Sequence, residues 1–158
     1  MASQQSGAAQ RALELAIAVE HHNGNRFLEW ADRFRSYDPA ISAFLEELAD
    51  EERDHEEKLL TAYRELFAEE PPRIVPTELE RYTLGLLAIR DHFLVVDSAM
   101  ARTLLETALE IERYTRQFYS ELWANTTDTA LAEVYRRLSE FEAEHERVFE
   151  NRIGQLAE

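Results

Sequence analysis

The two halves of the chain carry the same arrangement of glutamate and histidine, and this repeat limits the folds that the sequence can adopt. Each half has a lone glutamate followed by a Glu-x-x-His motif: Glu20 with Glu52 and His55, then Glu112 with Glu142 and His145. The lone glutamates lie 92 positions apart, and the corresponding motif residues lie 90 apart. The repeat indicates two units of one design. Because a spacing of three places two side chains on one helix face, each motif can present both residues to a single core.

The distribution of glycine and proline predicts an all-α fold. Only four of each occur in 158 residues, and the stretches between them are rich in Ala, Leu, Glu and Arg, which favour helix. Asp38 followed by Pro39 is typical of a helix start. The prolines after residue 70 end a helix, and a capping box opens a short one. The expected helices are residues 8–35, 39–68, 98–123 and 129–153, with a short helix at 79–90.

The repeated residues should meet near the middle of a helical bundle. Glu20 lies 15 positions before Arg35, and Glu52 lies 13 after Pro39, so both stand about 20 Å from their connecting turn at 1.5 Å per residue. The second hairpin has matching spacings. For the hairpins to close face to face, the crossover must return the chain along the bundle, which predicts an up-down-down-up topology. Four glutamates and two histidines then converge, as in di-iron carboxylate bundles.

Composition limits the ligands, the partners and the location. The chain has no cysteine, so a metal would bind carboxylate oxygen, imidazole nitrogen or water. The net charge of −15 argues against nucleic-acid binding, which needs clustered Lys and Arg. No apolar run approaches the roughly 20 residues of a membrane span. Residues 1–10 lack the basic end and apolar core of a secretory signal, so we expect a cytoplasmic protein.

Four segments resemble the ferritin-like superfamily and, within it, the rubrerythrin-type di-iron domain. They are Ala-Ile-Ala-Val-Glu at 16–20, Glu-Glu-Arg-Asp-His at 51–55, Ala-Leu-Glu-Ile-Glu at 108–112 and Glu-Ala-Glu-His at 142–145. The resemblance extends over essentially the whole chain. It implies a single ferritin-like domain, residues 1–158, made of a hairpin at 8–68, a crossover at 69–97 and a hairpin at 98–153.

The resemblance also implies the role of each ligand. Glu52 and Glu142 would bridge two metal ions, with Glu20 and His55 completing one ion and Glu112 and His145 the other. The implied cofactor is two iron ions, with manganese as an alternative, because carboxylate and imidazole suit both metals.

The sequence departs from the family at two points. Many rubrerythrins have a further glutamate three residues after the third-helix ligand, whereas this chain has Thr115. Peroxidase behaviour that depends on that ligand is therefore not expected. Full-length rubrerythrins also carry a cysteine-bound iron that supplies electrons, so this chain would need an external electron donor. Tyr119 is predicted to hydrogen-bond a ligand carboxylate or to relay electrons, and Phe27, its counterpart in the repeat, cannot.

The remaining histidines, several other glutamates and the large aromatic residues are assigned structural roles and no part in the metal site. His21, His22 and His92 are interpreted as surface or helix-end residues. Five glutamates are interpreted as solvated and paired with nearby arginines: Glu51, Glu56, Glu57, Glu144 and Glu146. Six aromatic residues are interpreted as core or interface: Trp30, Phe44, Phe118, Trp123, Tyr135 and Phe149. The apolar stretch 84–96 should pack over the bundle or join a second subunit, and we expect a homodimer.

The predicted function is oxidation of ferrous iron, or reduction of oxygen or hydrogen peroxide, in iron handling or oxidative-stress defence. Two alternatives remain open at this level. One is an iron-storage or iron-delivery module, which would form a cage or act with a membrane partner. The other is a metal-free helical interaction bundle, whose melting temperature should not respond to a chelator.

Overall fold

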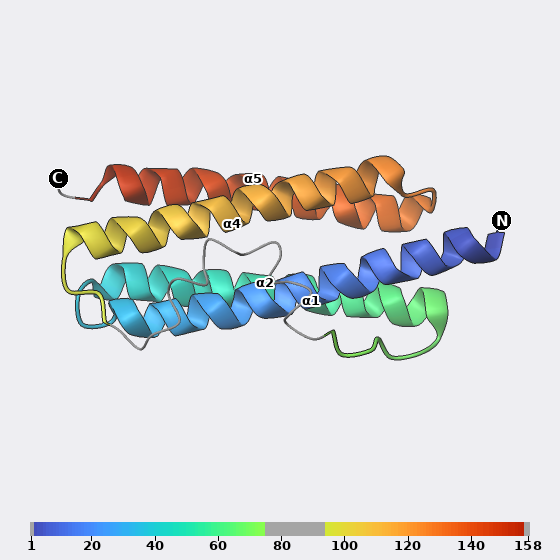
Figure 1. Cartoon of the computed structure of the whole chain (residues 1–158), viewed down its shortest axis with the longest axis horizontal. Coiled ribbons are helices and arrows are strands. Elements are labelled where there is room, and N and C mark those ends of the chain that lie inside the picture. The colour runs from blue at the N-terminus through green and yellow to red at the C-terminus, as the bar shows by residue number, and fades with distance from the viewer. Residues whose placement is uncertain (1, 75–93, 157–158) are drawn as a thin grey trace.

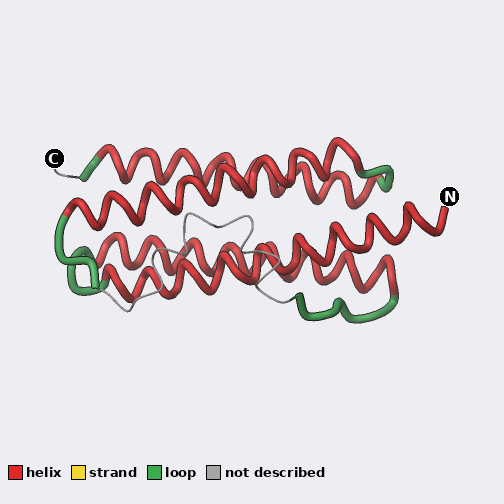
Figure 2. The backbone as a smooth tube through the Cα atoms, in the orientation of Figure 1, coloured by secondary structure: helices red, strands yellow, loops and turns green. Residues whose placement is uncertain are grey.

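The computed structural model describes residues 2–74 and 94–156, which form four long helices and contain no strand (Figures 1 and 2). The helices are α1 (Ala2–Phe34), α2 (Pro39–Phe67), α4 (Ser98–Asn125) and α5 (Thr129–Gly154). The predicted all-α fold is confirmed. α1 begins six residues earlier than predicted, because no proline in that stretch prevents the helix from extending.

Three of the helices begin at an aspartate that accepts backbone hydrogen bonds from the first turn. Asp38 accepts from Ala40 at 3.0 Å, as its position before Pro39 predicted. Asp97 and Asp128 do the same for α4 and α5, each at 2.8 Å. Such a cap contributes about 1 kcal/mol. The caps fix where each helix starts and therefore the height at which its later residues stand.

The helices run up, down, down and up, as the repeat predicted. In Figure 1, α1 and α5 run towards one end of the bundle, whereas α2 and α4 run towards the other. α1 packs along α2, and α4 packs along α5, so each half of the sequence forms one hairpin. The predicted short helix at 79–90 lies outside the described residues, as do His92 and most of the apolar stretch 84–96.

Two apolar clusters hold the hairpins together, one on each side of a polar layer. The first lies near the turn between α1 and α2 and includes Phe27, Trp30, Phe34, Phe44, Leu45, Leu104, Leu105 and Phe149. The second lies towards the other end and includes Leu13, Ile17, Leu59, Tyr63, Tyr119, Tyr135 and Leu138. Each large apolar side chain contributes about 1.5 to 3 kcal/mol on burial. Of the aromatics expected in a core or interface, Trp123 is 47% exposed and does not belong to the core.

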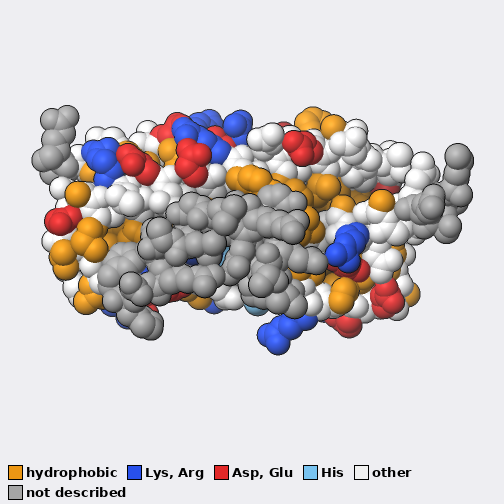
Figure 3. Space-filling view, viewed as in Figure 1, with side chains coloured by type: hydrophobic (Ala, Val, Ile, Leu, Met, Phe, Trp, Pro, Cys, Tyr) orange, Lys and Arg blue, Asp and Glu red, His pale blue; other side chains and the backbone are white. Residues whose placement is uncertain are grey.

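The surface carries interspersed charges. Acidic and basic side chains lie intermixed on the face shown in Figure 3, with hydrophobic side chains between them. Many of the arginines pair with a glutamate on the same helix, for example Arg113 with Glu110 at 2.7 Å. Among the described helices, none has the length and apolar character needed to cross a membrane.

Candidate metal centre

All four helices contribute to the polar layer between the two apolar clusters. The layer consists of the six repeated residues, Glu20, Glu52, His55, Glu112, Glu142 and His145. Each glutamate is fully buried, and each histidine is only 3% exposed. The structure therefore brings together every residue that the sequence assigned to a metal site.

These residues form two overlapping groups. Glu20 and His55 complete one group, Glu112 and His145 complete the other, and Glu52 and Glu142 belong to both. Within each group, one candidate ligand atom from every residue lies within 4.8 Å of the others. Two ions that share a pair of carboxylates would need this arrangement.

The two imidazoles direct the same nitrogen towards the carboxylates. His145 Nδ1 lies 3.1 Å from Glu112 Oε2 and 3.5 Å from Glu142 Oε2. His55 Nδ1 lies 3.7 Å from Glu20 Oε2 and 4.0 Å from Glu142 Oε1. The rings are nearly parallel, with centroids 6.1 Å apart. The repeat in the sequence is thus reflected in an approximate symmetry of the site.

Several buried polar atoms of the layer have no hydrogen-bond partner, and the glutamates expected to bridge two metal ions have the most such atoms. Both side-chain oxygens of Glu52 and both of Glu142 are buried without a hydrogen-bond partner. Glu20 and Glu112 each have one such oxygen, and His55 Nδ1 also lacks a partner. A buried polar atom left unpaired costs about 1 to 3 kcal/mol. Because carboxylate oxygen and imidazole nitrogen are ligands for divalent metals, the residues fit a two-metal site.

Burial and mutual repulsion change the proton affinity of the cluster. Burial and the charges of Glu142 and Glu20 raise the pKa of Glu52 well above its usual value. Burial and the charge of Glu112 raise the pKa of Glu142 in the same way. Burial also raises the pKa of Glu112. Four buried carboxylates cannot all ionise at neutral pH without cations, so bound protons or divalent metals must balance them.

Two members of the cluster behave differently. Burial opposes ionisation of Glu20, but its interactions with Glu52 and His55 and the hydrogen bond from Tyr119 outweigh it and lower the pKa of Glu20. Burial disfavours the charged form of His145, but its bonds to the surrounding carboxylates outweigh that effect and raise its pKa. The shifts of Glu20 and His145 therefore favour the charged form of each, unlike those of Glu52, Glu112 and Glu142.

Tyr119 hydrogen-bonds a carboxylate of the layer, as predicted, and that carboxylate belongs to the opposite hairpin. Its hydroxyl donates to Glu20 Oε1 on α1, although Glu112 precedes it on its own helix. Tyr119 is fully buried, and burial together with the charge of Glu20 raises its pKa well above 10. Phe27, the counterpart in the repeat, packs in the first apolar cluster. The site is therefore symmetric in its glutamates and histidines but not in its surroundings.

Thr115 occupies the position at which many rubrerythrins have a further glutamate. Its side chain is 1% exposed and donates a hydrogen bond to the backbone oxygen of Ile111 at 2.9 Å. It also accepts one from Asn23 Nδ2 at 3.3 Å. Asn23 is the repeat counterpart of Thr115, since each follows a lone glutamate by three residues. A buried, neutral and hydrogen-bonded pair therefore stands at the two repeat positions three residues after the lone glutamates.

Glu51 is exposed, as interpreted from the sequence, but the expected pairing with an arginine is wrong, because its partner is His145. Its carboxylate Oε2 lies 2.6 Å from Nε2 of His145, the nitrogen that faces away from the layer. Nothing along α2 signals this role, because the partner lies on α5, 94 positions away. Glu56 contacts His21 at 3.1 Å, whereas an arginine was expected as its partner. Glu146 pairs with Arg116 as expected, but it is only 9% exposed and is therefore not solvated.

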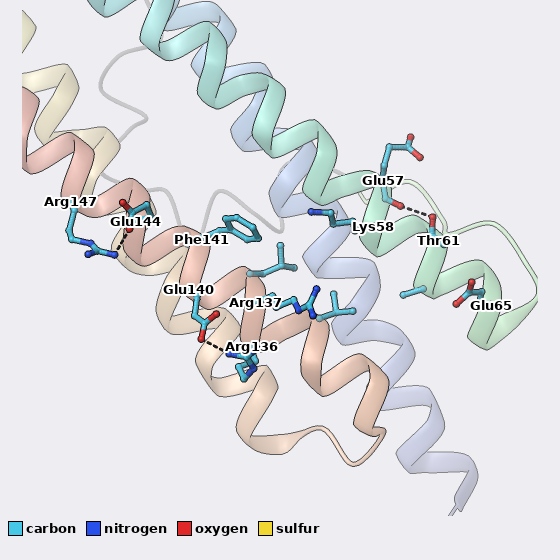
Figure 4. A pocket seen from close by; sticks show the side chains of 13 residues that line it. Glu57, Lys58, Thr61, Glu65, Arg136, Arg137, Glu140, Phe141, Glu144 and Arg147 are labelled. Carbon is cyan, nitrogen blue, oxygen red and sulfur yellow. Dashed lines mark hydrogen bonds and ion pairs between the residues drawn. The ribbon is translucent and has the colours of Figure 1, made fainter.

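A groove of about 1130 Å³ lies between α2 and α5, near the group of Glu20 and His55 (Figure 4). Phe141 lies in the groove lining and points towards α2, and its ring centroid is 5.1 Å from that of His55. The amine of Lys58 lies 5.3 Å from the same ring. Phe141 is 43% exposed, so the ring that contacts His55 also faces the groove.

The bundle and its buried layer of carboxylates and imidazoles define a ferritin-like protein with a candidate two-metal centre. Within that class, the first half of the chain is similar to rubrerythrins. The family model described as Rubrerythrin matches residues 11–84, which contain Glu20, Glu52 and His55. This match confirms the resemblance inferred from the sequence.

A solved structure supports the fold over most of the chain. A hypothetical protein from Pyrococcus furiosus aligns with a TM-score of 0.70 and 17% sequence identity, covering 92% of this chain and 88% of that chain. At this level of identity the likeness shows the fold alone. No curated protein matches the chain.

Proposed function

We propose that the chain is a di-iron carboxylate oxidoreductase that oxidises ferrous iron, reduces oxygen or hydrogen peroxide, or does both. The observation that carries this proposal is the set of buried, unpartnered oxygen and nitrogen atoms at the centre of the bundle. Seven such atoms belong to five of the six repeated residues. Hydrogen bonds do not satisfy them, whereas a pair of cations would.

The pattern of unpartnered atoms supports a distinct role for each glutamate. Glu52 and Glu142 have both oxygens available and belong to both groups, so we assign them as bridging ligands. Glu20 and Glu112 each have one oxygen available, which suits a terminal ligand. His55 and His145 would complete the two ions. Carboxylate and imidazole together favour iron, and manganese is the alternative metal.

The surrounding residues would prepare the site for redox chemistry. When bound, two ferrous ions supply the two electrons that reduce oxygen or peroxide. The apolar clusters exclude bulk water, and the Tyr119 hydroxyl holds the carboxylate of Glu20 in place. Relay of electrons through Tyr119 is a further part of the proposal. The chain has no cysteine to hold a separate electron-transfer iron, so electrons would come from an external donor.

We further propose that the protein acts in the cytoplasm as a homodimer. Leu94 and Val96, the described end of the apolar stretch 84–96, are 57% and 71% exposed, which suits a contact between subunits. Light scattering should give the mass of a dimer. A mass of many subunits would instead favour an iron-storage cage.

The central test is metal loading followed by oxidation. Protein loaded anaerobically with ferrous iron should retain about two irons per chain by elemental analysis. Oxygen and hydrogen peroxide, added separately, should then change the absorbance at rates that identify the preferred oxidant. Glu52→Gln should lose the paired site, whereas Glu57→Gln, an exposed change on the same helix, should not. Failure of the wild-type protein to bind either iron or manganese stoichiometrically would overturn the proposal.

A further inference from the structure

The two halves of the site differ at one pair of positions related by the repeat. Glu51 directly precedes Glu52, and Phe141 directly precedes Glu142, so the two positions are 90 residues apart like the motifs themselves. Each side chain reaches across to a histidine on the other hairpin. Glu51 on α2 contacts His145 on α5, and Phe141 on α5 contacts His55 on α2. The same place in the repeat thus holds a carboxylate in one half and an aromatic ring in the other.

Glu51 holds the His145 ring from the side opposite the layer. Its Oε2 lies 2.6 Å from His145 Nε2, while Nδ1 of the same ring faces Glu112, Glu52 and Glu142 at 3.1 to 3.5 Å. The Glu51 side chain is 53% exposed, whereas the His145 side chain is 4% exposed. When a carboxylate accepts the hydrogen of one ring nitrogen, the other nitrogen keeps its lone pair for a metal.

His55 has an apolar neighbour at the equivalent position. Phe141 offers a ring face, inclined at 39° to the imidazole, and has no atom that can accept a hydrogen bond from a ring nitrogen. In Figure 4 this ring stands on α5 and faces α2 close to Lys58. Packing of this kind restrains the imidazole plane but does not select which nitrogen carries the proton.

We propose that Glu51 is a positioning residue that makes the half-site of Glu112 and His145 the tighter of the two metal sites. Its carboxylate orients the His145 ring and strengthens Nδ1 as a metal ligand. The half-site of Glu20 and His55, which has Phe141 in place of this carboxylate, is the weaker one and fills second. This inference rests on the proposed metal site and adds an order of binding to it.

Anaerobic titration with Mn²⁺ tests the order, because the free ion is measured directly by electron paramagnetic resonance and no oxidation is involved. The wild-type protein should bind two ions in separate steps. Glu51→Gln should weaken the first step by about 10- to 100-fold, the usual effect of losing such a partner. Glu47→Gln makes the same charge change at another exposed position on α2, one turn earlier, and should leave both steps unchanged.

A double-mutant design identifies the half-site through which Glu51 acts. In a His55→Ala background, which leaves the His145 half intact, Glu51→Gln should still weaken binding. In a His145→Ala background the effect should vanish. Phe141→Glu provides the converse test, because a carboxylate at this position should strengthen the second step. Circular dichroism of each variant establishes that the bundle is folded.

The outcomes separate this inference from the proposed function. Two bound ions in the wild-type protein with unchanged constants in Glu51→Gln would overturn the inference and leave the metal site standing. An equal loss in the His145→Ala background would also overturn it, since the effect would then be general electrostatics. A wild-type protein that binds no Mn²⁺ and no ferrous iron would overturn the proposed function on which the inference rests.

Discussion

Tyr119 on α4 donates its hydroxyl hydrogen bond to Glu20 on α1, a residue 99 positions away in the opposite hairpin. The bond ties the two repeats together at the level of the polar layer, where direct packing between α1 and α4 is sparse. The ring of Tyr119 also stacks on that of Tyr135, with centroids 6.1 Å apart. The two tyrosines share an environment, but in the described structure only the hydroxyl of Tyr119 has a partner.

Replacing Tyr119 by phenylalanine should lower the free energy of unfolding by about 1.5 to 3 kcal/mol, the range for a hydrogen bond to a charged group. The same substitution at Tyr135 removes a buried hydroxyl that has no partner, so it should be neutral or stabilising. Urea denaturation of both variants measures the difference. Equal losses at the two positions would contradict a specific contribution of the bond to Glu20, because both substitutions remove a hydroxyl and keep the ring.

Replacing Glu52 by glutamine should change stability and metal binding in opposite directions. Without metal, the substitution removes a charge that burial and the neighbouring carboxylates disfavour, so the bundle should become more stable at pH 8. With metal, it removes a bridging ligand, and the paired site should be lost. Thermal unfolding with and without Mn²⁺ measures both effects. A metal-free variant less stable than the wild-type protein would contradict the electrostatic account.

The metal-free protein should lose stability as pH rises from 5 to 8. The pKa values of Glu52, Glu142 and Glu112 are raised in the folded state, whereas the unfolded chain titrates near the ordinary value of 4.5. Above pH 4.5 the unfolded state therefore binds fewer protons, and linkage makes the free energy of unfolding fall with pH. His145, with its pKa raised above 6.5, acts in the same direction.

Urea midpoints at several pH values measure this trend, and the Glu52→Gln variant provides its control, because removing one raised carboxyl should flatten the profile. Saturating Mn²⁺ should reverse the trend, since metal displaces the protons of the cluster and binds more tightly as pH rises. A metal-free profile that is flat or rising between pH 5 and 8 would contradict the assignment of raised pKa values.

A chelator should lower the melting temperature of protein isolated with its metal. A ligand present at 100 times its dissociation constant stabilises a fold by about 2.7 kcal/mol, and a second ion adds to this. Differential scanning calorimetry before and after chelation measures the change, and readdition of Mn²⁺ should restore it. An unchanged melting temperature after complete removal of the metal would contradict the coupling of metal binding to the stability of the bundle.

The helices were predictable because their signals are local. Asp38 and Pro39 mark a helix start through contacts within one turn, and the scarcity of glycine and proline forces long helices between such marks. The convergence of the six repeated residues was predictable for a related reason. Helix rise converts sequence spacing into height, so similar spacings from a turn place Glu20 near the height of Glu52.

The amino-acid sequence by itself determined the four helices, their order and the six residues that line the centre, because periodicity and spacing act along the chain. Only the tertiary structure decided that Tyr119 bonds Glu20, that Glu51 bonds His145 and that Phe141 covers His55. Each of these contacts joins helices of different hairpins. It depends on the rotation of one helix against another, and no spacing within either helix encodes that rotation.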